Sequence, residues 1–368
     1  MKSYNHLWEK YATKDNMYLA IHKAVLGKKK KKYVMKVMKH IERHYDKIWD
    51  YAINFKPVKH VSRTIYDGVE RKKREITPPC FYEQIVHHMI MNVLIPILSK
   101  GMYTHSYASM PNKGVHKGAK YICKYISRNR NVTLYCYKAD IKQYFASVNK
   151  DILTEQLLEK IHDLKFMKII SAVIDSMPKG LSLGFYTSQW FANFYLTKFD
   201  HYVKEVLGAD FYIRYMDDIV IFDSDKKKLF KIHKAISDYL NTNLDLEIKK
   251  NWQVFRFSYD ENGEDRGRFL DFMGFKFYHN RMIIRRSIFL KATRKARRIN
   301  KKNKTTVHDS RQMLSYNGWL KYTDTYFAYQ KMIKPYISFS ELKHNVSIFD
   351  RRKKLCGENQ NAQTQKSH

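Results

Sequence analysis

The sequence predicts an α+β fold, and three features of the chain support this prediction. Hydrophobic residues make up 44% and aromatic residues 15% of the 368 residues, which is enough apolar material for an ordered core. Short apolar runs typical of β-strands alternate with segments whose apolar residues recur at helical spacing. At roughly 150 residues per unit, the length corresponds to about two or three compact units.

The net charge indicates the kind of partner. There are 69 Lys and Arg residues against 35 Asp and Glu residues, a formal net charge of +34. Such an excess opposes compaction unless a polyanion is usually bound, so nucleic acid is the first candidate. Four scattered cysteines without a C-x-x-C pair exclude a disulfide framework and favour a reducing cytoplasm. No segment has the length and apolarity of a signal peptide or a membrane span, so no membrane association is expected.

Residues 1–133 are predicted to be mostly helical, with one exposed basic ribbon. In this ribbon Asp67-Gly68 is a hairpin-turn signal, and a run of four basic residues follows it. The predicted elements are helices at 16–26 and 33–52, the ribbon at 60–79, a helix from 81 to Pro96, a loop at 101–118 and a basic helix at 119–128.

Residues 134–284 are predicted to form a sheet with covering helices. The predicted elements are strands at 134–139, 244–249 and 269–277, helices at 157–174, 184–207 and 229–240, and a β-hairpin at 211–222. From Arg285 the chain becomes basic and helical, and an aromatic-rich stretch runs on to Phe339. The tail at 346–368 is polar and is predicted to be disordered.

Three aspartates lie where apolar strands end. Asp140 ends the strand at 134–139, and Asp217 and Asp218 join the two arms of the hairpin. Strands of this kind pair in the middle of one sheet, so the three carboxylates are expected to meet. Clustered carboxylates repel one another and raise their own pKa values, which hard divalent cations relieve. Two such ions support in-line phosphoryl transfer. The alternative for an isolated Asp-Asp pair is an ordinary turn.

The order and spacing of seven motifs resemble those of a reverse transcriptase. The matching segments are Arg63–His88, Ser106–Ala119, Asp140–Phe145, Leu181–Asn193, Arg214–Phe222 with its Tyr-Met-Asp-Asp sequence, Leu246–Lys250 and Phe269–Phe277. The resemblance implies a right-hand polymerase. Its fingers would span residues 1–133 and its palm 134–284, an antiparallel sheet with helices that include 152–178. A helical thumb would span 285–345, and the tail 346–368 would follow.

The resemblance also implies an activity and the partners that serve it. The enzyme would be an RNA-directed DNA polymerase that uses dNTPs, a template RNA and the RNA–cDNA duplex. Its cofactors would be two Mg²⁺ ions, with Mn²⁺ as a substitute. Asp140, Asp217 and Asp218 match the catalytic metal ligands, and the main-chain carbonyl of Ile141 would be a further ligand.

The nucleotide-binding and duplex-binding residues are carried over in the same way. Phe145 would exclude a ribose 2′-hydroxyl, and its alternative is a core aromatic. Lys72 and Arg74 would hold the triphosphate. Either Lys249 or Lys250 would lie near the pyrophosphate, and the sequence does not choose between them. The remaining assignments are Leu183, Gly184 and Gln189 for nucleotide binding, Phe272, Met273, Gly274 and Phe275 for the primer grip, and Arg294, Lys295, Arg297 and Arg298 for nucleic-acid binding.

One departure indicates a subgroup. Many reverse transcriptases, including those of group II introns, have Gln-Gly followed by Ser-Pro where this chain has Leu183-Gly184 and Ser188-Gln189. This pattern is similar to diversity-generating retroelements of bacteria and phages. Their enzymes copy a template-repeat RNA into cDNA with errors opposite adenines (mutagenic retrohoming), with a small oligomeric accessory protein. A Gln amide could hydrogen-bond near the nucleotide, whereas Leu183 can only pack, so base-pair checking should loosen. The alternative is that Leu183 is ordinary packing.

Other assignments remain as alternatives. Glu83-Gln84 replaces the Asp-Arg that the family commonly has, which leaves the role of this pair open. A defence-associated reverse transcriptase that polymerises without a template is the closest alternative. A retron-type enzyme is disfavoured because its Val-Thr-Gly and Asn-Ala-x-x-His patterns are missing. A catalytically silent RNA-binding scaffold is less favoured still, because three clustered carboxylates would only weaken RNA binding.

Overall fold

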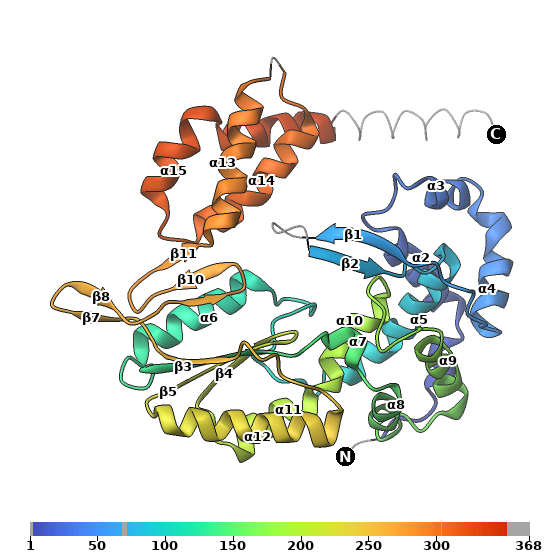
Figure 1. Cartoon of the computed structure of the whole chain (residues 1–368). Helices are drawn as coiled ribbons and strands as arrows, with labels where there is room; N and C mark the ends of the chain where they lie inside the picture. The colour runs from blue at the N-terminus through green and yellow to red at the C-terminus, as the bar shows by residue number, and fades with distance from the viewer. Residues whose placement is uncertain (1–2, 68–71, 303, 352–368) are drawn as a thin grey trace. The chain divides into compact units, whose positions relative to one another are not determined.

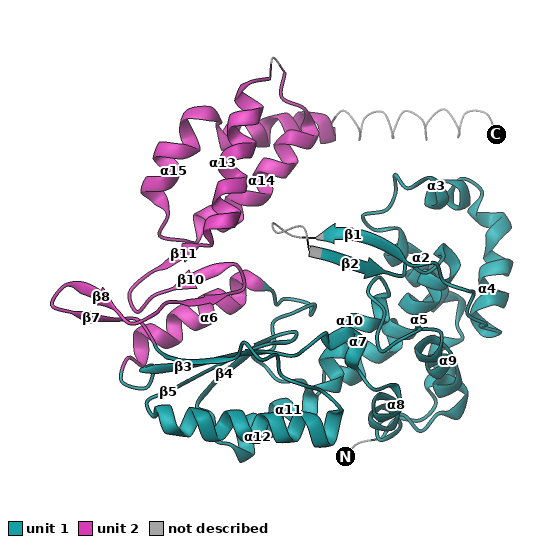
Figure 2. Cartoon of the chain, in the orientation of Figure 1, with its two compact units in different colours: residues 1–114, 131–256 teal, residues 115–130, 257–368 magenta. Residues whose placement is uncertain are grey.

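The structure, a computed structural model, describes residues 3–67, 72–302 and 304–351. Two compact units make up the chain (Figure 2). The first unit contains residues 1–114 and 131–256, and the second contains residues 115–130 and 257–368. Helices and antiparallel sheets are both present, so the predicted α+β class is confirmed. In the described part of the chain, no helix has both the length and the apolarity needed to cross a membrane.

The first unit begins with a group of helices that includes one long apolar helix, α5 (Phe81–Leu98; Figure 1). They are α1 (Leu7–Tyr11), α2 (Lys14–Val25), α3 (Lys32–Met38), the 3-10 helix η1 (Ile41–His44), α4 (Tyr45–Ile53) and α5 (Phe81–Leu98). The helices α1, α2 and α4 pack on α5. The single helix expected at 33–52 is wrong, because His40 leaves the helical backbone at φ −136° and the redirected chain lets Ile48 enter the core. Helix α5 continues two residues beyond Pro96.

The basic ribbon is an antiparallel hairpin of β1 (Arg63–Asp67) and β2 (Lys72–Ile76). Ile65 lies opposite Arg74 in the register. The predicted turn at Asp67-Gly68 extends into residues 68–71, which lie outside the described residues.

A four-stranded antiparallel sheet forms the centre of the first unit, in the order β4-β5-β3-β6. Its strands are β3 (Tyr135–Asp140), β4 (Phe211–Tyr215), β5 (Asp218–Asp223) and β6 (Gln253–Arg256). The accompanying helices are α7 (Tyr144–Ser147), α8 (Lys150–Leu158), α9 (Leu164–Asp175), α10 (Tyr186–Tyr195), α11 (Thr197–His201), the π-helix η2 (Tyr202–Val206) and α12 (Lys226–Leu244). Helix α12 packs on β3, β5 and β6.

The strand predicted at 244–249 is wrong. Asp245 takes a left-handed backbone conformation (φ +51°) that ends α12, and the segment then contributes one isolated bridge, between Ile248 and Ile141. The place beside β3 is filled by β6 instead. Alternating apolar residues are therefore not sufficient here, because a strand also needs a free sheet edge with which to pair.

The second unit combines small sheets with a helical bundle. Its elements are α6 (Val115–Arg128), β7 (Tyr259–Glu261), β8 (Glu264–Arg266), β9 (Leu270–Phe272), β10 (Phe275–Phe277), β11 (Met282–Ile284), α13 (Arg286–Asn300), α14 (Val307–Lys321), α15 (Tyr326–Met332), the 3-10 helix η3 (Lys334–Tyr336) and a helix at 339–351. The strand expected at 269–277 is a hairpin of β9 and β10. Residues 346–351 of the predicted tail are helical, and 352–368 lie outside the described residues.

Candidate active site

The central sheet brings the three predicted aspartates together. The pairing of β3 with β5 places Asp140 opposite Asp218, although 77 other residues separate the two in the chain. Asp217 lies in the tight turn between β4 and β5, and its carbonyl accepts a hydrogen bond of 3.2 Å from the N–H of Ile141. The register of the sheet therefore places the three strand-end aspartates at the same end of the sheet, as expected.

The turn that carries Asp217 is held by a buried ion pair. Met216, just before it, has φ +57°, a left-handed conformation that is uncommon for a side chain of this size. Arg214 Nη1 donates a hydrogen bond of 2.7 Å to the Met216 carbonyl. The same guanidinium contacts both carboxylate oxygens of Asp200, at 2.8 and 2.6 Å, and Tyr212 also donates to Asp200. Arg214 and Asp200 are almost fully buried, so their charges depend on each other.

This pair is not among the functional residues predicted from the sequence. Arg214 is the only basic residue in the two arms of the hairpin, and an isolated charge in an apolar strand is a signal that could have been followed. Its partner lies 14 residues earlier, on α11, and no local pattern links the two.

Electrostatics at the aspartates favour cation binding. Burial raises the pKa of Asp218 to about 7, with further increases from the charges of Asp217 and Asp140. Burial, and then the charge of Asp140, also raise the pKa of Asp217, while the positive charges of Lys249 and Arg74 act in the opposite direction. A site that resists the ionisation of its own carboxylates gains most from an added positive charge.

The two candidate lysines differ in their surroundings. Lys249 Nζ lies 2.5 Å from Asp140 Oδ1, and the Lys249 N–H donates to the Asp140 carbonyl at 2.8 Å. Lys250 is exposed. Lys249 is thus the lysine that reaches the carboxylates, a choice that the sequence left open.

The donor set suits a hard divalent cation. Three carboxylates at one sheet end supply the oxygen ligands that such ions prefer, and the raised pKa values of Asp217 and Asp218 indicate an unmet need for positive charge. Within residues 3–67, 72–302 and 304–351, no three His, Cys, Asp or Glu side chains form a ready-made metal centre. One oxygen of Asp140 instead contacts the ammonium group of Lys249.

Phe145 contacts residues 180–184, the segment that contains the predicted nucleotide-binding residues Leu183 and Gly184, through the backbone. Its carbonyl accepts a hydrogen bond of 2.6 Å from the N–H of Leu181. A Cβ atom on Gly180 would lie 2.4 Å from that carbonyl oxygen, and Gly180 also has φ +49°. Only glycine permits this close approach. Phe145 itself is partly buried and packs against the hydrophobic core.

The same segment is tied to the basic ribbon. The Thr77 N–H donates to the Leu183 carbonyl at 2.8 Å, directly after β2. Gly184 has φ +113°, and a Cβ there would lie 3.2 Å from the Thr77 carbonyl oxygen. Leu183 is half-buried, and Gln189 is exposed on α10.

Arg74 and Lys72 both belong to β2. Arg74 is exposed, and its charge acts on Asp217, which places the guanidinium near the carboxylates. Lys72 is a strand residue whose side chain lies outside the described part of the structure.

The remaining predicted residues belong to the second unit. Phe272 and Phe275 are paired across the β9–β10 hairpin, and Met273 and Gly274 form its turn with φ +51° and +87°. A Cβ on Gly274 would lie 2.7 Å from the Trp319 ring, so glycine is required at this point of the turn.

On α13 the basic residues have two kinds of environment. Arg294, Arg297 and Arg298 are exposed. Lys295 instead forms an ion pair of 2.7 Å with Asp309, which fastens α13 to α14. The three arginines are therefore better placed than Lys295 to contact phosphates.

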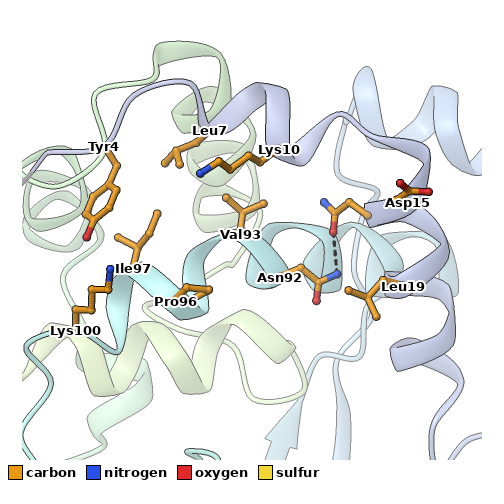
Figure 3. A pocket seen from close by; sticks show the side chains of 11 residues that line it. Tyr4, Leu7, Lys10, Asp15, Leu19, Asn92, Val93, Pro96, Ile97 and Lys100 are labelled. Atoms are coloured by element: carbon orange, nitrogen blue, oxygen red, sulfur yellow. Dashed lines mark hydrogen bonds between the residues drawn. The ribbon is translucent and has the colours of Figure 1, made fainter.

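A separate pocket in the first unit lies among α1, α2 and α5 (Figure 3). It has a volume of about 440 Å³, and Leu7, Val93 and Ile97 contribute to its apolar lining. Asn92 and Asn16 are joined there by a hydrogen bond of 2.8 Å. None of the residues predicted for catalysis or nucleotide binding lines it.

Comparison with known proteins identifies relatives of the chain. The model of the family described as reverse transcriptase (RNA-dependent DNA polymerase) matches residues 28–277. No curated protein matches the chain.

Solved structures also match. One is telomerase from Candida albicans in complex with a TWJ fragment of telomeric RNA, at 11% identity and a TM-score of 0.47, covering 85% of this chain and 65% of that one. Another is telomerase from Candida tropicalis with such a fragment, at 13% identity and a TM-score of 0.48, covering 75% of this chain and 54% of that one. This chain thus spans 65% or less of the length of these telomerase chains.

Proposed function

The chain belongs to the reverse transcriptase (RNA-dependent DNA polymerase) family, and from this premise we propose that Asp140, Asp217 and Asp218 catalyse RNA-directed DNA synthesis. The observation that carries the proposal is the meeting of the three carboxylates at one end of the sheet, with raised pKa values at Asp217 and Asp218. The substrates would be dNTPs, and the partners a template RNA and the RNA–cDNA duplex.

The three aspartates, with the Ile141 carbonyl, would hold two Mg²⁺ ions, for which Mn²⁺ could substitute. When bound, such ions activate the attacking hydroxyl and stabilise the leaving oxygen. Arg74 and Lys249 would bind the triphosphate and offset its charge, with Lys72 as a further candidate. Lys249 is favoured over Lys250 because Lys249 contacts Asp140. Chelation with EDTA is expected to stop single-nucleotide incorporation, and added Mg²⁺ to restore it. Full activity in EDTA would contradict the proposal.

The right-hand domains follow as part of this proposal. Residues 1–133 would form the fingers, 134–284 the palm and 285–345 the thumb. In the second unit, Phe272, Met273, Gly274 and Phe275 would grip the primer, and the exposed arginines of α13 would contact the duplex phosphates.

Phe145→Ala is expected to admit ribonucleotides. The ring is partly buried and its backbone is tied to the nucleotide-binding segment, so truncation would open space where a 2′-hydroxyl would otherwise clash. The ratio of dNTP to rNTP incorporation should fall by at least about tenfold. Competing dCTP and CTP in a single-nucleotide assay measures this ratio. An unchanged ratio would remove the steric role of Phe145, and Tyr144→Phe, one residue away, is the matched control.

Our finer proposal is that the enzyme belongs to a diversity-generating retroelement. It would copy a template-repeat RNA with errors opposite adenines, assisted by a small oligomeric accessory protein in the cytoplasm. Support comes from Leu183, which precedes Gly184 and has a side chain without hydrogen-bonding groups. The main-chain carbonyl of Leu183 accepts a hydrogen bond from Thr77, directly after the basic ribbon. Gln189 would complete the nucleotide-binding segment.

Leu183→Gln tests this finer proposal. A hydrogen bond worth about 1 kcal/mol to the nascent base pair would lower misincorporation opposite adenine about fivefold. Deep sequencing of cDNA from an RNA template gives the error rate at each base. Leu183→Met is the control, because it changes the side chain without adding a hydrogen-bonding amide. If Leu183→Gln leaves the error spectrum unchanged, Leu183 has a packing role alone.

A further inference from the structure

A buried polar cluster lies next to the nucleotide-binding segment in the first unit. Glu83, in the first turn of α5, is completely buried. His60 Nε2 lies 2.8 and 2.9 Å from the two carboxylate oxygens of Glu83. One helical turn further along α5, His87 Nε2 lies 3.8 Å from Glu83 Oε1, and the His87 side chain is also fully buried. The three residues form what we call the Glu83 cluster.

The adjacent residue, Gln84, has a different environment. Its amide donates to the Pro79 carbonyl at 2.8 Å and accepts from Lys28 at 2.6 Å. In the Glu83-Gln84 pair, where this chain departs from the common family pattern, Glu83 therefore belongs to the cluster, whereas Gln84 bonds to Pro79 and Lys28.

The Glu83 cluster holds the ring of Phe185. The centroid of this ring lies 4.9 Å from that of His60 and 4.8 Å from that of His87, at interplanar angles of 71° and 67°. Both are edge-to-face contacts, a favourable arrangement for aromatic rings. Phe185 is 2% exposed, so its ring is enclosed. A second contact links the cluster to α10, because Thr187 Oγ1 lies 3.3 Å from His87 Nδ1.

Phe185 directly follows the segment that we assign to nucleotide binding. The other tethers of this segment described above are backbone hydrogen bonds, from Leu181 to Phe145 and from Thr77 to Leu183. Gly180 and Gly184 both have positive φ values and no side chains to pack. Glycines confer backbone freedom, so the buried side chains in and next to the segment, Leu181 and Phe185 at 2% exposure each, help to fix its position.

Resting on the proposed function, we propose that Glu83, His60 and His87 are positioning residues for the incoming nucleotide, acting through Phe185. Glu83 fixes the His60 imidazole through hydrogen bonds and lies 3.8 Å from the His87 imidazole, which Thr187 also contacts. The two imidazoles hold the Phe185 ring, and the ring helps to fix residues 181–184 between Phe145 and Thr77. A buried carboxylate keeps its place only when hydrogen-bonded, which makes Glu83 the residue on which the cluster depends. Displacement of a group that positions the substrate weakens nucleotide binding, because binding requires the interacting atoms to lie at defined distances and angles.

The kinetic test measures single-dNTP incorporation on an RNA template for Phe185→Leu, Glu83→Ala and Glu83→Gln. For Phe185→Leu and Glu83→Ala we expect KM for the dNTP to rise about tenfold, with kcat per folded molecule within about twofold of wild type. Glu83→Gln should restore most of the wild-type KM, because its amide oxygen can still accept from His60. Phe185→Leu leaves the Glu83–His60 pair intact, so it remains informative if Glu83→Ala fails to fold.

A matched control comes from the same helix. Tyr82 precedes Glu83 and has its own histidine contact, 2.5 Å from its hydroxyl to His44 Nδ1. Tyr82→Phe removes that hydrogen bond without touching Phe185, so it should leave KM at the wild-type value.

Amide hydrogen exchange gives a readout that does not depend on activity. The N–H groups of Leu181 and Thr77, which make the two tethers, should exchange faster in Phe185→Leu and Glu83→Ala but not in Tyr82→Phe. Unchanged exchange and unchanged KM, with only the folded fraction reduced, would overturn the positioning role. A wild-type enzyme that incorporates no nucleotide would instead contradict the proposed function, while the exchange data would still test the anchoring of the segment.

Discussion

Asp217→Asn is expected to abolish nucleotide incorporation, with a loss of at least about 10³-fold. Asparagine keeps the shape of the side chain but removes a charge from a site whose three carboxylates lie together at the end of one sheet. RNA affinity should stay the same or rise slightly, because a negative charge near the RNA phosphates is lost. A catalytic role for the Asp217 carboxylate predicts that activity is lost while RNA binding is kept.

Primer extension and RNA filter binding on the same purified protein measure the two properties. Asp245→Asn is the matched control, because Asp245 is an exposed aspartate of the same unit, in a left-handed conformation that asparagine tolerates. It should extend primers at the wild-type rate. Extension by Asp217→Asn at the rate of this control would contradict the assignment of Asp217.

Arg214→Met is expected to lower the free energy of unfolding by about 3–5 kcal/mol and to suppress incorporation. The substitution leaves the carboxylate of Asp200 buried without its cation and removes the donor to the Met216 carbonyl. Because Met216 has a left-handed backbone next to Asp217, the turn would lose the hydrogen bond that holds it.

The double variant Arg214→Met/Asp200→Asn separates stability from positioning. It removes both charges and keeps an acceptor for Tyr212, so urea unfolding should show part of the lost stability regained. Incorporation should remain low, because the Met216 carbonyl still lacks its donor. A double variant with the wild-type rate would contradict the role of Arg214 in holding the turn.

Lys198→Met provides the comparison for an exposed ion pair. Lys198 lies 2.6 Å from Glu159, and both side chains are more than 40% exposed. Such pairs contribute about 0–1 kcal/mol, so this variant should unfold close to the wild-type urea concentration.

The sequence predicted the central elements of the candidate site because their signals are local. Apolar strands that end in aspartate identify Asp140, Asp217 and Asp218, and the sheet register then brings them together as expected. The segment at 244–249 has an equally local alternating pattern, but it does not form the predicted strand, because β6 pairs with β3 instead. Which segment pairs with a sheet edge depends on the tertiary structure.

The supporting residues could not be predicted for a related reason. Asp200 and Arg214 lie on different elements, and His60 and Glu83 are 23 residues apart. Their partnerships arise only when the chain folds around them. The sequence indicated that Glu83-Gln84 was unusual, but the burial of Glu83 and its contacts with two histidines are properties of the structure.

The most direct test of RNA-directed synthesis is deep sequencing of the product that the purified wild-type chain makes from a defined primer. The reaction contains an RNA template, Mg²⁺ and all four dNTPs, and a parallel reaction omits the template. We expect cDNA complementary to the RNA, with errors concentrated opposite adenines, and no product without template. Product of the same length and composition in both reactions would contradict RNA-directed synthesis and favour a polymerase that works without a template.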